Sequence, residues 1–260
     1  MSGTTVRAPA APAGYAIGRE RGATVVALPS VIEDVRSCIA RAGTLYAAAA
    51  SAGGQAFTGR GAAWRMPHAG GDWIVRHYRR GGAVAHVLRD EYLRTGAARP
   101  LRELRASVAA RARGVATPEV LAGVVYPAGP FYRADLATRF IPDARDLAEV
   151  VLGERRAGPE ERVAAWHAAG VLLRAAFDAG VEHADLNLRN ILIAGGPGPR
   201  ALLLDLDRAV VRERAVDEAA RARMLERLRR SRRKLEAAAG RETDAAELAA
   251  FDAAVRGRDA

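Results

Sequence analysis

The stretch that decides the fold is His183-Ala184-Asp185-Leu186-Asn187-Leu188-Arg189-Asn190, which runs directly into the apolar residues Ile191-Leu192-Ile193. A turn rich in Gly and Pro, residues 195–199, separates this run from Leu203-Leu204-Asp205-Leu206-Asp207. Two short apolar runs joined by such a turn predict a buried hairpin. Asp185 and Asn190 then precede its first strand, and Asp205 ends its second. Their carboxylate and amide oxygens are suitable hard ligands for Mg²⁺.

The spacing H-x-D-x-x-x-x-N from His183 to Asn190 is that of a kinase catalytic loop. In that loop the Asp receives or orients the proton of the acceptor hydroxyl, and the Asn helps to hold a magnesium ion. The Asp after the next strand binds the magnesium that bridges the phosphates. We therefore expect Asp185, Asn190 and Asp205 to be catalytic, with Asn190 and Asp205 as metal ligands. Each residue alone would be read as a turn former or helix cap, so the prediction depends on their combination.

Asp207 stands where protein kinases carry the glycine of D-F-G. It is either a further magnesium ligand or a helix cap for the following segment, and both interpretations stay open. His183 is expected to pack and hydrogen-bond in the loop rather than to take protons.

Three further elements of a kinase are expected upstream of the loop: a hairpin over the phosphates, a cation on the next strand and a glutamate that holds the cation. Gly59-Arg60-Gly61 supplies the hairpin turn, although an ordinary turn would also explain it. Arg76 is the expected cation, and Glu103 on a helix is its expected partner. Arg79 and Arg80 compete for the role of the cation, and a solvated basic strand end is the plain alternative.

The pattern of apolar residues predicts an α+β chain. We expect strands at 24–28, 120–126 and 131–140, a hairpin from 57–66 and 72–78, and helices at 30–51, 84–94, 101–113, 160–179 and from 212 onward. Ser30 is the expected N-cap of the first helix. The domain prediction is an N-terminal extension over 1–50 with a mobile start, a small antiparallel-sheet N-lobe over 51–142, and a reduced, mostly helical C-lobe over 143–260 with basic C-terminal helices.

The composition limits the class of protein and the partners to be expected. The 260 residues are 50% hydrophobic, enough for a sizeable core. Cys38 is the single cysteine and is expected to be a small buried residue of the first helix. No run of about eighteen apolar residues and no signal-peptide core occurs, so membrane contact would be peripheral. The formal net charge of +10 favours anionic partners.

These motifs together resemble the 3-deoxy-D-manno-octulosonic acid (Kdo) kinases, in the lipopolysaccharide kinase group of the protein-kinase-like superfamily. The resemblance covers all but about the first fifty residues. Arginine in place of the strand lysine and D-x-D in place of D-F-G are habits of this group. Stretches that carry the resemblance, besides the loop, are Gly59–Gly61, Val75–Gly82, the helix with Glu103, Phe131–Thr138, and Leu225–Ser231.

The resemblance implies a two-lobed protein-kinase-like fold and an ATP- and Mg²⁺-dependent transfer of phosphate to a hydroxyl, the 4-hydroxyl, of Kdo on lipid A. It places the enzyme at the cytoplasmic face of the bacterial inner membrane, as a peripheral protein of lipopolysaccharide biosynthesis. Gly59, Arg60, Gly61, Arg76 and Glu103 would then bind the nucleotide. No argument from the residues places Arg133 or Asp135 at the sugar rather than in packing.

The C-terminal segment 221–235 offers two compatible interpretations. If it is helical, Met224, Leu225, Leu228 and Leu235 fall on one face, and Arg227, Arg229, Arg230 and Arg233 lie outside it. Such a helix could rest on an anionic membrane. It could equally pack on the second lobe with a solvated basic back.

The sequence also bears on other functions. A protein serine/threonine kinase is disfavoured because about fifty-five residues follow Asp205 and none form an A-P-E segment. A kinase for an aminoglycoside or another sugar shares the catalytic loop and stays open. A catalytically silent kinase-like module at the membrane is a further alternative, but the presence of Asp185, Asn190 and Asp205 argues against it. Nucleic acid is not expected as a partner, since the arginines are scattered and no zinc or helix-turn-helix pattern occurs.

Overall fold

The computed structural model describes residues 11–57, 63–79, 90–195 and 198–257. Gly59, Arg60, Gly61 and Arg80 lie outside the described residues, as does the segment 84–89 of an expected helix. The chain divides into two compact units. The first contains residues 1–105 and 120–140, and the second contains residues 106–119 and 141–260. The domain limits expected at residues 50 and 142 stay predictions.

An antiparallel sheet forms the first unit, with strands in the order β1-β2-β7-β8-β5-β4-β3 and β6 paired with β8. The strands are β1 (Ala16–Glu20), β2 (Ala23–Ala27), β3 (Ala56–Phe57), β4 (Ala63–Met66), β5 (Trp73–His77), β6 (Tyr92–Leu93), β7 (Val120–Ala128) and β8 (Phe131–Arg139). The predicted hairpin is confirmed, because β4 pairs with β5. The helix expected over 84–94 is wrong where it is described, since β6 occupies that part as an extended strand.

The single helix expected over 30–51 is two helices, α1 (Ile32–Ala42) and α2 (Leu45–Ser51). Gly43 ends α1 with a φ of 81°, a conformation that glycine adopts without steric cost. Thr44 then caps α2, because its hydroxyl accepts a hydrogen bond from the Ala47 amide at 3.0 Å. The predicted cap at Ser30 is also wrong, since Val31 is the N-cap of α1.

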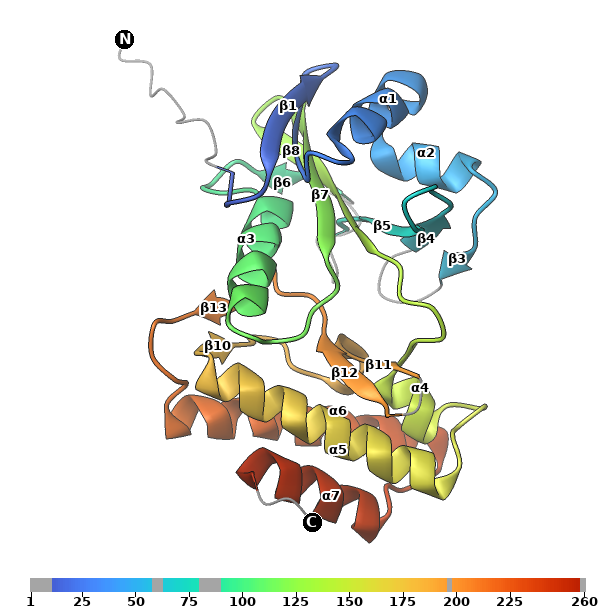
Figure 1. The fold of residues 1–260 in the computed structure, drawn as a ribbon, viewed down its shortest axis with the longest axis vertical. Helices are drawn as coiled ribbons and strands as arrows, with labels where there is room; N and C mark the ends of the chain where they lie inside the picture. Colours follow the sequence, from blue (N-terminus) through green and yellow to red (C-terminus); the bar gives the residue numbers. More distant parts are fainter. Residues whose placement is uncertain (1–10, 58–62, 80–89, 196–197, 258–260) are drawn as a thin grey trace. The chain divides into compact units, whose positions relative to one another are not determined.

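Helices cover both faces of this sheet (Figure 1). On one face, α1 and α2 pack through buried Val35, Cys38, Ile39, Leu45 and Ala49 into the first unit's core. On the other face lies the beginning of α3 (Arg99–Ala112). A methyl group on Gly123 of β7 would come within 3.4 Å of Pro100 and Leu101. Along β5, Trp73 and Val75 belong to the core shared with α1 and α2, whereas Arg76 pairs with Glu103 of α3.

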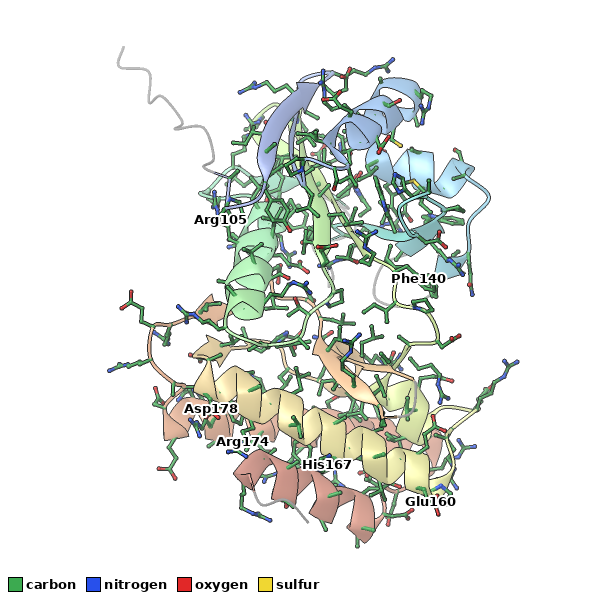
Figure 2. All side chains as sticks on the ribbon, in the orientation of Figure 1. Arg105, Phe140, Glu160, His167, Arg174 and Asp178 are labelled. Atoms are coloured by element: carbon green, nitrogen blue, oxygen red, sulfur yellow. The ribbon has the colours of Figure 1, made fainter. Side chains whose placement is uncertain are left out.

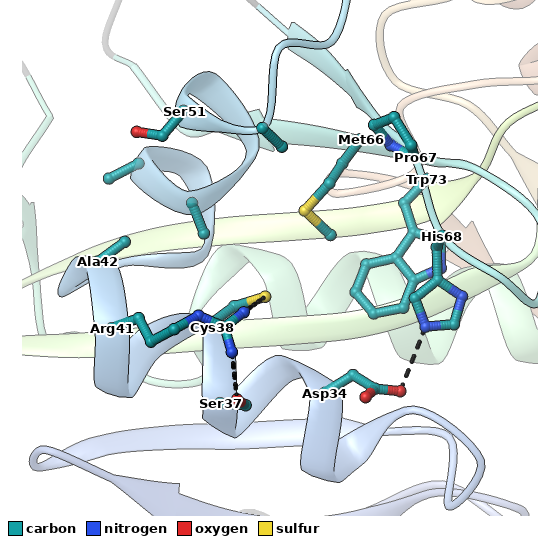
Figure 3. A pocket seen from close by; sticks show the side chains of 13 residues that line it. Asp34, Ser37, Cys38, Arg41, Ala42, Ser51, Met66, Pro67, His68 and Trp73 are labelled. Atoms are coloured by element: carbon teal, nitrogen blue, oxygen red, sulfur yellow. Dashed lines mark hydrogen bonds and ion pairs between the residues drawn. The ribbon is translucent and has the colours of Figure 1, made fainter.

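A groove of about 700 Å³ lies between α1, α2 and the β4–β5 hairpin (Figure 3). Alanines, Met66 and Trp73 form much of its wall. Arg41 donates to the Ser37 hydroxyl at 2.7 Å, and His68 Nε2 lies 3.2 Å from Asp34 Oδ2. Neither Arg76 nor Glu103 lines this groove, so it is separate from the expected cation pair.

The second unit is mostly helical. Its helices are α4 (Leu147–Leu152), α5 (Pro159–Asp178), the 3₁₀ turn η2 (Leu188–Asn190), α6 (Glu218–Ala239) and α7 (Ala245–Arg256). Its strands are β9 (Arg145–Asp146), β10 (Val181–Glu182), β11 (Ile191–Ala194), β12 (Arg200–Leu203) and β13 (Val210–Val211). The predicted hairpin is confirmed as β11 and β12. The continuous helix expected from 212 is wrong, because Gly240 in the left-handed region ends α6.

Helix α7 is held against α5 by a buried ionic network. Arg162 Nε donates to Glu247 Oε1 at 2.7 Å, and Trp166 Nε1 donates to Glu247 Oε2 at 3.0 Å. Farther along, a methyl group on Gly170 would lie 2.6 Å from the carbonyl oxygen of Phe251, so only glycine allows this approach. Exposed polar side chains also occur along α5, among them Glu160, Arg174 and Asp178 (Figure 2). Among the described helices none is long and apolar enough to cross a membrane.

Replacing Glu247 by alanine should lower the free energy of unfolding by about 3 kcal/mol or more, because it leaves the buried Arg162 guanidinium without its principal partner. Urea denaturation followed by circular dichroism measures the change. Glu242→Ala, an exposed position, is the control. A loss no greater than that of the control would show that the network does not hold α7.

Candidate active site

The segment that carries Asp185 is a tight loop fixed by two asparagines. Asn187 Nδ2 and Asn190 Nδ2 both donate to the carbonyl oxygen of Asp185, at 2.8 and 2.9 Å. Asn187 also caps η2, because its Oδ1 accepts from the Arg189 amide at 3.0 Å. The backbone is thus set around an exposed Asp185 side chain. Because Asn190 Nδ2 is the donor in this bond, the acceptor atom Oδ1 is the one suited to bind a cation.

His183 joins this loop to the strand that precedes Asp205. Its Nε2 lies 2.9 Å from the carbonyl oxygen of Leu204, and its Nδ1 lies 3.2 Å from the Asp185 amide nitrogen. A carbonyl only accepts and an amide N–H only donates, so the ring is neutral with its proton on Nε2. Burial lowers the pKa of His183, against the opposing charges of Asp205, Asp185 and Asp207. The prediction that His183 packs and hydrogen-bonds in the loop is confirmed.

Asp205 adopts a left-handed backbone conformation with a φ of 58°. Aspartate tolerates this region better than most residues, but the conformation is still strained and is frequent at functional sites. The Asp205 side chain is partly exposed, whereas Asp207 is 4% exposed. Asp207 is followed by a turn and β13, and Asp217 is the N-cap of α6. The helix-cap interpretation of Asp207 is therefore wrong for the helix that follows.

The donor set of this loop is compatible with magnesium. Within the described ranges, no cluster of three or more His, Cys, Asp or Glu side chains is placed to hold a metal. Magnesium commonly binds through one or two carboxylates and keeps waters and phosphate oxygens for its other positions. One carboxylate from Asp205 and one amide oxygen from Asn190 meet that requirement.

In the first unit, Arg76 and Glu103 form the ion pair expected between them. Glu103 is 5% exposed, and it also accepts a hydrogen bond of 2.5 Å from the Tyr78 hydroxyl. The Arg76 guanidinium lies 4.9 Å from the centre of the Tyr78 ring. The competing Arg79 is exposed at the end of the strand. Of the described arginines beside β5, Arg76 is therefore the one fixed by a buried carboxylate.

Residues 53–251 match the lipopolysaccharide kinase (Kdo/WaaP) family. The chain belongs to this family. A 3-deoxy-D-manno-octulosonic acid kinase of Stenotrophomonas maltophilia strain R551-3 is 38% identical over 179 residues, 68% of each chain. One of Xanthomonas axonopodis pv. citri strain 306 is 40% identical over 187 residues, 71% of each chain. The prediction of a kinase, a phosphotransferase acting on a hydroxyl group, is thus confirmed at the level of the family.

A solved structure of WaaP in complex with acyl carrier protein matches with a TM-score of 0.53 and 20% identity, over 82% of this chain and 83% of that one. At this identity the likeness concerns the fold. The predicted protein-kinase-like α+β fold is confirmed by it.

In this lipopolysaccharide kinase, α6 packs on the loop that contains Asp185. Met224 and Leu228 are buried in the second unit's core, and Leu225 and Leu235 pack against it. The Leu188 amide donates to the Ser231 hydroxyl at 3.3 Å. The interpretation of this helix as packed on the second unit is confirmed, with Met224 and Leu228 buried and Leu225 and Leu235 partly buried.

Sequence reasoning missed a buried cluster on the other side of β5. His77 Nδ1 lies 2.6 Å from Asp135 Oδ1, and His77 Nε2 lies 3.1 Å from Asp90 Oδ2. Fully buried Asp135 also accepts from the Tyr126 hydroxyl at 2.7 Å and the Tyr46 amide at 2.9 Å. Asp135 is therefore a packing residue that joins α2 to the strand of Arg76. The sequence signal was an acidic residue between the apolar residues Ala134 and Leu136 of a strand.

Burial disfavours the charged form of His77, but its bonds to Asp135 and Asp90 outweigh burial and raise its pKa. A pKa above the unfolded value means that the cluster stabilises the fold fully below the ordinary histidine pKa, and that this contribution is lost as pH rises through the folded pKa. The gap in unfolding free energy between wild type and His77→Gln should therefore be larger at about pH 6 than at about pH 9. Urea titrations at both pH values measure it. A constant gap would contradict a charged His77.

Proposed function

We propose that this chain transfers the γ-phosphate of ATP to the 4-hydroxyl of Kdo attached to lipid A. The observation that carries the proposal is the loop in which neutral His183 ties Asp185 to the strand before Asp205. The relatives named as Kdo kinases, and the family match over residues 53–251, support the acceptor.

Each residue of the loop has a role in this proposal. Asp185, exposed on a fixed backbone, orients the Kdo hydroxyl and accepts its proton as the oxygen attacks the γ-phosphorus. The bond from that phosphorus to ADP breaks. Asn190 Oδ1 and Asp205 would hold the magnesium ion, with Asp207 as a further candidate, and the ion's charge would offset that of the phosphates.

Residues of the first unit would bind the nucleotide. Arg76 is the proposed phosphate cation, and Glu103 orients its guanidinium. Gly59, Arg60 and Gly61 are proposed to lie over the phosphates, as expected from their position in the sequence. Arginine serves here because its planar group can bond a carboxylate and a phosphate oxygen together.

The proposed location is the cytoplasmic side of the bacterial inner membrane, as a peripheral protein. The net charge of +10 favours approach to an anionic surface and to an acceptor that carries a carboxylate and phosphates. Each basic side chain near such a surface contributes about 1 kcal/mol. Since the apolar side of α6 is packed in the protein, this attraction would be electrostatic.

The test is mass spectrometry of a Kdo-bearing lipid A precursor, and of the same precursor without Kdo, after incubation with the chain, ATP and magnesium. One added phosphate on the Kdo-bearing lipid alone is the expected result. Transfer to neither lipid, with ATP still bound, would direct the search to another sugar or an aminoglycoside-type acceptor. ATP binding that does not depend on magnesium would favour a catalytically silent module.

Asp185→Asn should lower kcat by at least about a hundredfold, because amide nitrogen and oxygen cannot accept the hydroxyl proton as a carboxylate does. Nucleotide affinity should change little. Asp178→Asn, an exposed position on α5, is the matched control and should retain activity. Steady-state kinetics measure the loss, and near wild-type turnover in Asp185→Asn would exclude it as the base.

A further inference from the structure

One side of α6 carries a row of basic residues to which the proposed chemistry gives no role. They follow one another at spacings i, i+4, i+7 and i+11, and we call them the basic flank: Arg223, Arg227, Arg230 and Lys234. With 3.6 residues per turn, these positions lie along one side of a helix. The basic flank borders the buried stripe that contains Met224 and Leu228. Arg229 is equally basic but lies on a different, exposed side.

The basic flank runs beside the catalytic loop. At one end, Arg223 Nη2 lies 3.8 Å from Glu182 Oε1. Farther along, Ser231 accepts from the Leu188 amide at 3.3 Å. Arg227 is four residues after Arg223 and four before Ser231, so it lies between these two contacts. Because Glu182 and Leu188 lie on either side of Asp185 in the sequence, α6 runs along the segment that carries the proposed base.

Arg227 has unused hydrogen-bonding capacity. Its Nη1 is buried and, among the residues that the structure describes, has no hydrogen-bond partner. Other arginines of α6 are bonded: Arg221 donates to the Val216 carbonyl at 2.8 Å, and Arg233 donates to Glu226 at 2.7 Å. A buried cationic donor strongly favours an oxygen acceptor. Arg227 as a whole is partly exposed, so other parts of its side chain are open to solvent.

We propose that the basic flank binds the anionic groups of the acceptor, with Arg227 bonding the acceptor's carboxylate while the hydroxyl lies at Asp185. The proposal rests on the proposed function, since Kdo is a sugar acid with a carboxylate within one ring of its hydroxyls. Guanidinium and carboxylate form strong charge-assisted hydrogen bonds. The exposed members of the flank, Arg223, Arg230 and Lys234, would meet further anionic groups such as phosphates.

The test uses a deacylated, Kdo-bearing acceptor in solution, so that membrane attraction plays no part. Arg227→Gln should raise the KM for this acceptor by at least about tenfold, the loss of a charge-assisted hydrogen bond, with kcat and the KM for ATP within about twofold. Arg227→Lys should recover part of the affinity. Arg229→Gln, the same charge change on the other side of α6, should behave as wild type.

A second experiment changes the acceptor, so its wild-type comparison does not depend on whether a variant folds. The methyl ester of the acceptor carboxylate should be a poorer substrate for wild type, and Arg227→Gln should no longer distinguish acid from ester. A wild-type chain that treats acid and ester alike, or an Arg227→Gln variant with the wild-type acceptor KM, would overturn the inference while the proposed function stands. A wild-type chain that phosphorylates no Kdo-bearing acceptor would overturn both.

Discussion

The candidate site depends on one buried, neutral imidazole. Both ring nitrogens of His183 bond to backbone groups: Nδ1 accepts from the Asp185 amide, and Nε2 donates to the Leu204 carbonyl oxygen. His183 and Leu204 are 21 residues apart in the sequence, and the β11–β12 hairpin between them brings the chain back. A charged ring would donate from both nitrogens and could not accept from the Asp185 amide. Burial, which lowers the pKa of His183, therefore helps to keep the loop in one arrangement despite the carboxylates nearby.

Each unit also contains a buried carboxylate that hydrogen-bonds to several partners. In the first, fully buried Asp135 joins α2 to the strand of Arg76 through three hydrogen bonds, with His77, Tyr126 and the Tyr46 amide. In the second, Glu247 fixes α7 to α5 through Arg162 and Trp166. Removing one partner of such a group leaves the other buried and unpaired, which costs more than the bond itself contributes. Neither network includes a residue of the proposed site.

The sequence was most informative where the pattern is local. Asp185, Asn190 and the two strands of the hairpin lie within a short segment, so spacing and apolar runs sufficed to predict them. The Arg76–Glu103 pair, 27 residues apart, was predicted from the order of elements in kinases. The His77–Asp135 and Arg162–Glu247 pairs, 58 and 85 residues apart, depend on register and helix packing that no local pattern reveals. The break at Gly43 was missed because alanines on both sides favour helix.

Asp205, with Asn190, is proposed to make nucleotide binding dependent on magnesium, and calorimetry of ATP binding with and without magnesium is the decisive measurement. Asp205→Asn should lose most of the magnesium-dependent gain in affinity that wild type has. Asp143→Asn is the matched control, because Asp143 also has a positive φ, of 54°, and asparagine tolerates that conformation. Loss in Asp205→Asn alone is the predicted result. An unchanged magnesium dependence in Asp205→Asn would contradict the account.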